Sequence, residues 1–207
     1  TRDTRYNGTA DFTKNGPSTD NSNGGNYFAS TLLFTNTGGS YVTMANNVPD
    51  TNIGNATFTS SGTASYRIAD NTGINNFSGN LTFNHSGTSA DNYLLNAAGT
   101  VNISGTTTVN NTGSRWNYMG NNTNAVINYN GNIVVNNTSA AGIYLGNATG
   151  TYTLADGATI TVGGTGFTQG SMILRDFTQL GNTAQNIDLG PGNGYLQFYN
   201  ATFNGNL

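Results

Sequence analysis

Short stretches in which apolar and polar residues alternate recur along the chain, separated by turn residues. Residues 81–83 (Leu-Thr-Phe) and 93–95 (Tyr-Leu-Leu) are two such stretches within one unit of sequence. Successive side chains of a β-strand point to opposite faces, so each stretch predicts a short strand with one apolar face. The pattern therefore predicts many short strands, two in each unit.

The units repeat with a period of 25 to 27 residues. The residue types that open or fill each unit recur at equivalent positions. Glycines that open the units are Gly54, Gly79, Gly105 and Gly131. The apolar residues four positions later are Phe58, Phe83, Val109 and Val135. Tyrosines in the second half of the units are Tyr41, Tyr66, Tyr93, Tyr118 and Tyr144. One such unit cannot bury its apolar face alone, whereas stacked units can.

The predicted fold is all-β, a single parallel β-helix over residues 1–207 with roughly eight coils of about 25 residues each. Equivalent residues of successive coils would then lie above one another. The phenylalanine and valine positions predict one interior column, and the tyrosines predict a second with hydroxyls at a corner. Asn84, Asn110 and Asn136 predict an asparagine ladder at a turn, because Asn tolerates turn conformations and its amide can bond to neighbouring coils.

The repeat loosens at both ends of the chain. Residues 203–207 (Phe-Asn-Gly-Asn-Leu) repeat the coil opening at 77–81 (Phe-Ser-Gly-Asn-Leu), and residues 6–9 also resemble an opening. Open end coils would present unpaired strand edges. We therefore expect a segment of a longer repeat array, or a subunit that stacks end to end on copies of itself.

Composition supports a folded β protein with an uncharged surface. Charged residues make up 7% of the chain, against about 25% in average domains, and Asn, Thr and Gly replace them. The 35% of hydrophobic and 11% of aromatic residues are regularly spaced, which argues against disorder. This composition is typical of extracellular or cell-surface proteins.

Charge and cysteine content exclude several classes of function. The net charge is −3 and the basic residues are scattered, which argues against nucleic-acid binding. No apolar run reaches about 18 residues, so no membrane insertion is expected in this segment. The chain has no cysteine, which excludes disulfides and cysteine-based zinc sites.

The acidic residues do not predict a catalytic or metal site. All nine are aspartates, and Asp50, Asp70 and Asp91 follow each other at intervals shorter than the repeat period. Paired catalytic carboxylates on adjacent coils would need one shared column. The only histidine, His85, falls in an Asn-rich corner and is predicted to be solvated. We expect no enzyme activity, no catalytic or metal-binding residues and no cofactor.

Two surface features leave other functions open. Trp116 with Tyr118 could form a platform on which sugars stack, although burial in the interior column is favoured. Threonines at 57 and 59 and at 106–108 resemble part of the regular array of an ice-binding face. The outward positions mix Thr with Asn, Ser and Val, which favours ordinary surface residues.

Several phrases of the sequence resemble a known group of proteins. These are TADFTKNG, SNGGNYF, SGNLTFNHSG, GIYLGN, TLADGATITVGGTGF, LRDFTQLGNTAQ and ATFNGNL, in order from residue 6 to 207. They resemble the long repetitive extracellular proteins of Bacteroidetes, especially flavobacteria, which are β-helical surface or adhesin-like polypeptides. The resemblance implies export by the type IX secretion system. That system uses a C-terminal sorting domain, and no such domain is visible here, in keeping with a segment of an array. The family offers no catalytic motif.

The sequence thus predicts a structural extracellular repeat protein, forming a stalk, filament or adhesin segment on the cell surface. Its expected partners are copies of itself or further repeats, with surface glycans as additional candidates. A carbohydrate-binding adhesin module is the alternative, and an ice-binding β-solenoid is a further one.

Overall fold

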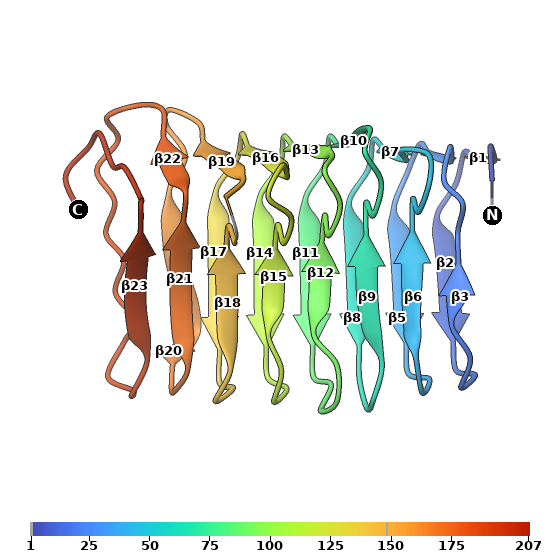
Figure 1. Cartoon of the computed structure of the whole chain (residues 1–207), viewed down its shortest axis with the longest axis horizontal. Coiled ribbons are helices and arrows are strands. Elements are labelled where there is room, and N and C mark those ends of the chain that lie inside the picture. Colours follow the sequence, from blue (N-terminus) through green and yellow to red (C-terminus); the bar gives the residue numbers. More distant parts are fainter. Residues whose placement is uncertain (1, 148) are drawn as a thin grey trace.

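The strands of this chain stack into three parallel sheets that run the length of an elongated molecule (Figure 1). The computed structural model describes residues 2–147 and 149–207, apart from the side chain of residue 165, and every regular element in it is a β-strand. The two ends of the chain lie at opposite ends of the stack (Figure 1). The predicted all-β parallel β-solenoid of about eight turns is confirmed.

Each sheet takes about one strand from every coil. The first sheet has the order β1 (Arg5–Tyr6), β4 (Tyr27–Phe28), β7 (Thr51–Asn52), β10 (Ile74–Phe77), β13 (Thr100–Ile103), β16 (Val126–Tyr129), β19 (Thr151–Leu154) and β22 (Phe177–Gln179). The second sheet has the order β2 (Ala10–Lys14), β5 (Leu32–Asn36), β8 (Ala56–Ser60), β11 (Leu81–His85), β14 (Thr107–Asn111), β17 (Ile133–Asn137) and β20 (Ile160–Phe167). The third sheet has the order β3 (Asp20–Asn21), β6 (Tyr41–Met44), β9 (Ser65–Ile68), β12 (Asn92–Leu94), β15 (Asn117–Met119), β18 (Gly142–Leu145), β21 (Ser171–Arg175) and β23 (Tyr195–Tyr199).

A complete coil contains three strands, whereas the sequence predicted two. The strand that was missed belongs to the first sheet, as in β10, β13 and β16. Its outward positions include Ile74 and Val126, so apolar residues face both sides and the alternation is blurred. Only three residues then separate it from the second-sheet strand, so the two strands read as one apolar patch.

The core is one continuous apolar interior, enclosed by the three sheets. On the second sheet, β8, β11, β14 and β17 all alternate between buried and half-buried residues. The buried cluster runs without interruption from Ala10 in the first coils to Phe177 in the last. Parallel strands pair in register from coil to coil, so each inward residue packs on its equivalents above and below.

In several coils, a glycine lies in the middle of the corner between the first and second sheets. Gly54, Gly79, Gly105 and Gly131 are the middle residues of three-residue corners, and each lies directly over the same corner of the preceding coil. A Cβ atom on Gly105 would come within 2.6 Å of the backbone carbon and oxygen of Gly79. The repeated glycine therefore reflects close approach of backbones at this corner.

Substitution of Gly105 by alanine should destabilise the solenoid by about 1–3 kcal/mol, because the added methyl overpacks the contact with Gly79. Urea unfolding followed by the fluorescence of Trp116, the only tryptophan, measures the change. Ser104→Ala, one residue earlier at an exposed position, is the matched control. A gain of about 0.4–1 kcal/mol, as an unstrained Gly→Ala change gives, would contradict the close approach.

Candidate binding surfaces on the outer faces of the coils

The predicted interior column is present and serves the fold. Phe58, Phe83, Val109 and Val135 occupy one register position on successive strands of the second sheet. Each is at most 1% exposed. The rings of Phe58 and Phe83 stack with centroids 5.6 Å apart. These residues are enclosed on all sides, so they cannot contact a ligand.

Three of the predicted tyrosines form a ladder on the outer face of the third sheet. Tyr93, Tyr118 and Tyr144 share one register position, and their rings stack with centroids 5.2 and 5.0 Å apart. All three side chains are half-buried. Burial, together with the nearby Asp91 carboxylate, raises the pKa of Tyr118 to about 12, so its hydroxyl stays neutral.

The other two tyrosines do not belong to this ladder, which corrects the sequence prediction of five. Tyr66 pairs with Val42 and points inward, fully buried, where its hydroxyl donates a hydrogen bond to the Phe34 carbonyl at 2.8 Å. One residue of offset moves a side chain to the opposite face of a sheet, and the ladder position is taken by Arg67 instead.

Tyr41 lies two residues before the ladder position, where it pairs with Ser65. The guanidinium carbon of Arg67 lies 4.6 Å from the ring centroid of Tyr41 and 5.9 Å from that of Tyr93. Arg67 therefore continues the ladder through cation–π contacts. The tyrosine column also differs from the prediction in facing outward, with its rings on the outside of the third sheet.

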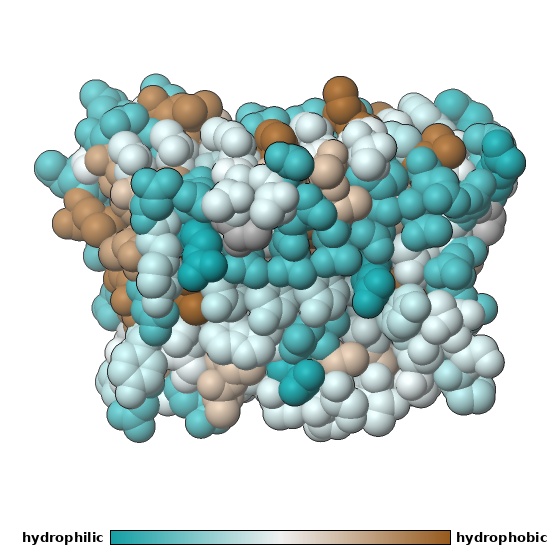
Figure 2. Space-filling model, in the orientation of Figure 1, coloured by the Kyte–Doolittle hydropathy of each residue, from teal (hydrophilic) through white to brown (hydrophobic). Residues whose placement is uncertain are grey.

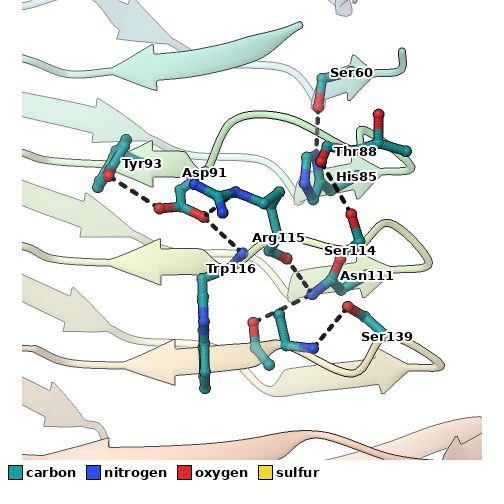
Figure 3. A network of polar contacts seen from close by, with 12 residues as sticks. Ser60, His85, Thr88, Asp91, Tyr93, Asn111, Ser114, Arg115, Trp116 and Ser139 are labelled. Carbon is teal, nitrogen blue, oxygen red and sulfur yellow. Dashed lines mark hydrogen bonds and ion pairs between the residues drawn. The ribbon is translucent and has the colours of Figure 1, made fainter. Parts of the chain in front are cut away.

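Trp116 is on the outer face as well, and not in the interior column. Its ring centroid is 5.1 Å from that of Tyr144 and 6.3 Å from that of Tyr118. A Cβ atom on Gly142 would come within 2.8 Å of the Trp116 ring, so the ring lies over this glycine. Asp91 anchors the segment by accepting a hydrogen bond from the Trp116 backbone at 2.9 Å (Figure 3).

The stacking of the tyrosine rings determines whether a ring face is free to bind a sugar. Sugars pack their C–H groups against the face of an aromatic ring. Both faces of the Tyr118 ring are covered, by Tyr93 on one side and Tyr144 on the other, so the ring presents its edge outward. The aromatic ladder is thus better suited to joining the coils than to serving as a sugar platform.

The predicted asparagine ladder exists, but its residues belong to strands, one position before the strand ends, and not to a turn. Asn84, Asn110 and Asn136 are in register on the outer face of the second sheet. Asn110 donates to Asn84 at 2.8 Å and Asn136 donates to Asn110 at 2.6 Å. Asn84 in turn donates to Thr59 Oγ1 at 3.3 Å. These bonds join four coils and hold the side chains in fixed orientations.

Two further ladders were missed, although their asparagines recur with the same period in the sequence. On the outer face of the first sheet, Asn128 donates to Asn102, and Asn102 donates to Asn76. Near the corner after the third sheet, the corresponding residues are Asn96, Asn121 and Asn147. Amide ladders therefore run along several lines of the molecular surface, which accounts for the abundance of asparagine.

His85 is buried, so the prediction of a solvated corner is wrong. It is the last residue of β11, points inward and is 1% exposed. Its Nδ1 lies 2.9 Å from Ser60 Oγ (Figure 3). Ser60 Oγ also accepts a hydrogen bond from Asn92 Nδ2 at 2.8 Å. Burial lowers the pKa of His85 to about 4, and the carboxylate of Asp91 opposes this only in part. The imidazole is neutral at neutral pH.

Asp50 is a second buried titratable group, in the corner before β7. Asn26 donates to its carboxylate from the backbone at 2.8 Å and from Nδ2 at 3.0 Å. The backbone of Asp50 donates to Asn75 Oδ1 at 3.0 Å. Burial raises the pKa of Asp50 to about 6 against these hydrogen bonds. The aspartate thus sits between two asparagines of neighbouring coils.

The described part of the chain, residues 2–147 and 149–207, contains no group of three metal-binding side chains. Within the same residues no helix is long and apolar enough to cross a membrane. Comparison with protein-family models, curated proteins and solved structures finds no match to the chain. The outer faces and the two ends of the solenoid are the surfaces at which the described residues can contact other molecules.

Proposed function

We propose that the chain is a structural repeat segment of an extracellular stalk, filament or adhesin, and that its end coils stack on further repeats or on copies of itself. The observation that carries this proposal is the contrast between the sides and the ends of the solenoid. Ladders of uncharged Asn side chains run along two of the sides, whereas apolar side chains are exposed at both ends.

At the N-terminal end, the interior opens into a hollow of about 230 Å³. Its apolar lining comes from Phe12, Phe34, Val42 and Met44 of the first two coils. The third-sheet strand of the first coil, β3, is only two residues long and exposed. Phe12 and Phe34, which continue the interior column, are consequently only partly buried.

At the C-terminal end, large apolar side chains are exposed. Phe198, which is in register with the fully buried Leu174, is 40% exposed, and Leu207 is 63% exposed. Hydrophobic atoms gather at this end of the surface, on the left of Figure 2. Phe198 belongs to β23, which pairs with β21 on one side and forms the edge of the third sheet on the other.

The two ends suit head-to-tail contact. The strand pairs of the three sheets are parallel, so a second copy in the same orientation can extend the ladders without a change of direction. Such contact is heterologous, and repetition of it produces an open filament rather than a closed ring. It would also satisfy the free backbone groups of the edge strands.

The expected result is concentration-dependent growth of unbranched rods with the width of one solenoid, seen by electron microscopy and by sedimentation. Phe198→Lys places a charge in the end contact and should shift the distribution strongly toward monomers. Ile74→Lys is the matched control, because Ile74 is 58% exposed on a lateral face, and it should assemble like the parent chain. Monomers at every accessible concentration of the parent chain, or equal effects of both substitutions, would refute end-to-end stacking.

A further inference from the structure

The outer face of the second sheet carries two straight columns of side chains. The strands of this sheet are five residues long from β2 to β17, so each presents two outward residues. The first column is Asp11, Leu33, Thr57, Thr82, Thr108, Val134 and Thr161. The second column is Thr13, Thr35, Thr59, Asn84, Asn110 and Asn136.

The columns form a regular two-dimensional array. The strands from β2 to β17 pair in an unbroken register. The first irregularity is in the pairing of β17 with β20, where the register shifts between Val135 and Asn137. Neighbouring strands lie about 4.8 Å apart, and alternate residues of one strand about 6.6 Å apart. The first sheet has a less extensive array, because its strands β1, β4 and β7 are only two residues long.

The array is uncharged and its side chains are constrained. Between Leu33 and Asn136 neither column contains a charged residue. Most positions in the first column are β-branched, and such side chains are restricted in χ1, so each threonine has few alternative orientations for its methyl and hydroxyl groups. The Asn side chains of the second column are held by their own ladder. Little side-chain freedom remains to be lost when a surface is bound.

We propose that this face binds ice, an activity beyond the structural role of the solenoid. The repeat distances of the two columns are close to those between oxygen atoms on a face of hexagonal ice. An uncharged lattice of methyl and hydroxyl groups can order water in the same arrangement, whereas a charged or mobile surface cannot. The Thr57 and Thr59 pair, followed by Thr82 and Thr108, forms the most regular part of the array.

The test is thermal hysteresis and ice-crystal shape with the full chain. The parent protein should hold a supercooled crystal without growth and give it facets. The double substitution Thr57→Lys with Thr108→Lys inserts two bulky charges, two coils apart with Thr82 between them, into the proposed face. It should lose most of the hysteresis while its circular dichroism and unfolding midpoint stay close to those of the parent.

The matched control is Thr100→Lys with Thr151→Lys, which places two charges with the same two-coil separation on the outer face of the first sheet. This variant should keep the activity of the parent. Absence of thermal hysteresis in the parent protein would overturn the proposal. So would retention of activity in the second-sheet variant, or equal loss in both variants. Because neither pair touches the solenoid ends, rod assembly is measured separately, and its failure leaves this test unaffected.

Discussion

Replacement of Phe83 by alanine is expected to lower the free energy of unfolding by about 3–5 kcal/mol, the range found when a buried aromatic side chain is truncated. Phe83 is 1% exposed and stacks on Phe58 in the interior column. Backbone ladders on either side fix the distance between coils, so the coils cannot collapse into the space that the ring leaves. The loss should appear in the midpoint of urea unfolding, with little change in its slope.

Thr82→Ala is the control for this experiment, because Thr82 is the preceding residue on the same strand and points outward. A surface change of this kind is usually within about 0.5 kcal/mol of the parent. If Phe83→Ala cost no more than Thr82→Ala, Phe83 would not be an interior residue and the register of β11 would be wrong.

The second large effect concerns pH. We expect two buried groups to change the free energy of unfolding in opposite directions as the pH changes. The folded-state pKa of His85 is lowered from 6.5 to about 4. Between these values the unfolded chain binds more protons than the folded chain, so stability contributed by neutral His85 is present above pH 6.5 and is lost as pH falls toward 4. The full loss is on the order of 3 kcal/mol.

Asp50 acts in the opposite direction. Its folded-state pKa is raised from 3.8 to about 6, so the folded chain binds more protons between these values. Its contribution to stability is fully present below pH 3.8 and is lost as pH rises through 6, again on the order of 3 kcal/mol. Between pH 4 and 6 the two groups largely cancel in the parent chain.

Two substitutions separate these effects without disturbing the coil. His85→Asn introduces the residue that Asn111 and Asn137 supply at the same position of the next two coils. Asp50→Asn introduces the residue found on both sides of it, at Asn26 and Asn75. Urea unfolding from pH 4 to pH 7 should show Asp50→Asn losing stability as pH falls, and His85→Asn gaining it.

The variant with both substitutions shows the pH dependence of unfolding that comes from all other groups. These include the remaining carboxylates and the charges near His85, such as Asp91 and Arg115. Relative to it, each single variant should show the slope of the one group that it retains. Parallel pH curves for all four proteins would mean that neither side chain is buried in the way described.

The sequence was sufficient to predict the β-solenoid because stacking imposes one period on every column. Phe83 and Val109 share a column as their spacing predicts, and so do Asn84 and Asn110. A period alone does not tell which face a residue occupies. Tyr66 and Arg67 show the difficulty, since a shift by one residue within a strand places the expected ladder residue in the core.

The sequence pattern also did not reveal which polar residues are buried. His85 lies in an Asn-rich segment, and such segments are usually solvated turns. Here the corner side chain turns inward and bonds to Ser60 of the preceding coil. The signal for this was available in the spacing, because His85 ends a strand in which Leu81 and Phe83, at alternate positions, are buried.

The glycine corner between the first and second sheets also determines where the chain can change length. In the central coils this corner is always three residues long, at 78–80, 104–106 and 130–132. The other two corners vary, as in the segments 61–64 and 86–91 between the second and third sheets. Insertions and deletions should therefore accumulate at those two corners. Gene duplications that keep the first corner intact would add whole coils while leaving every column in register.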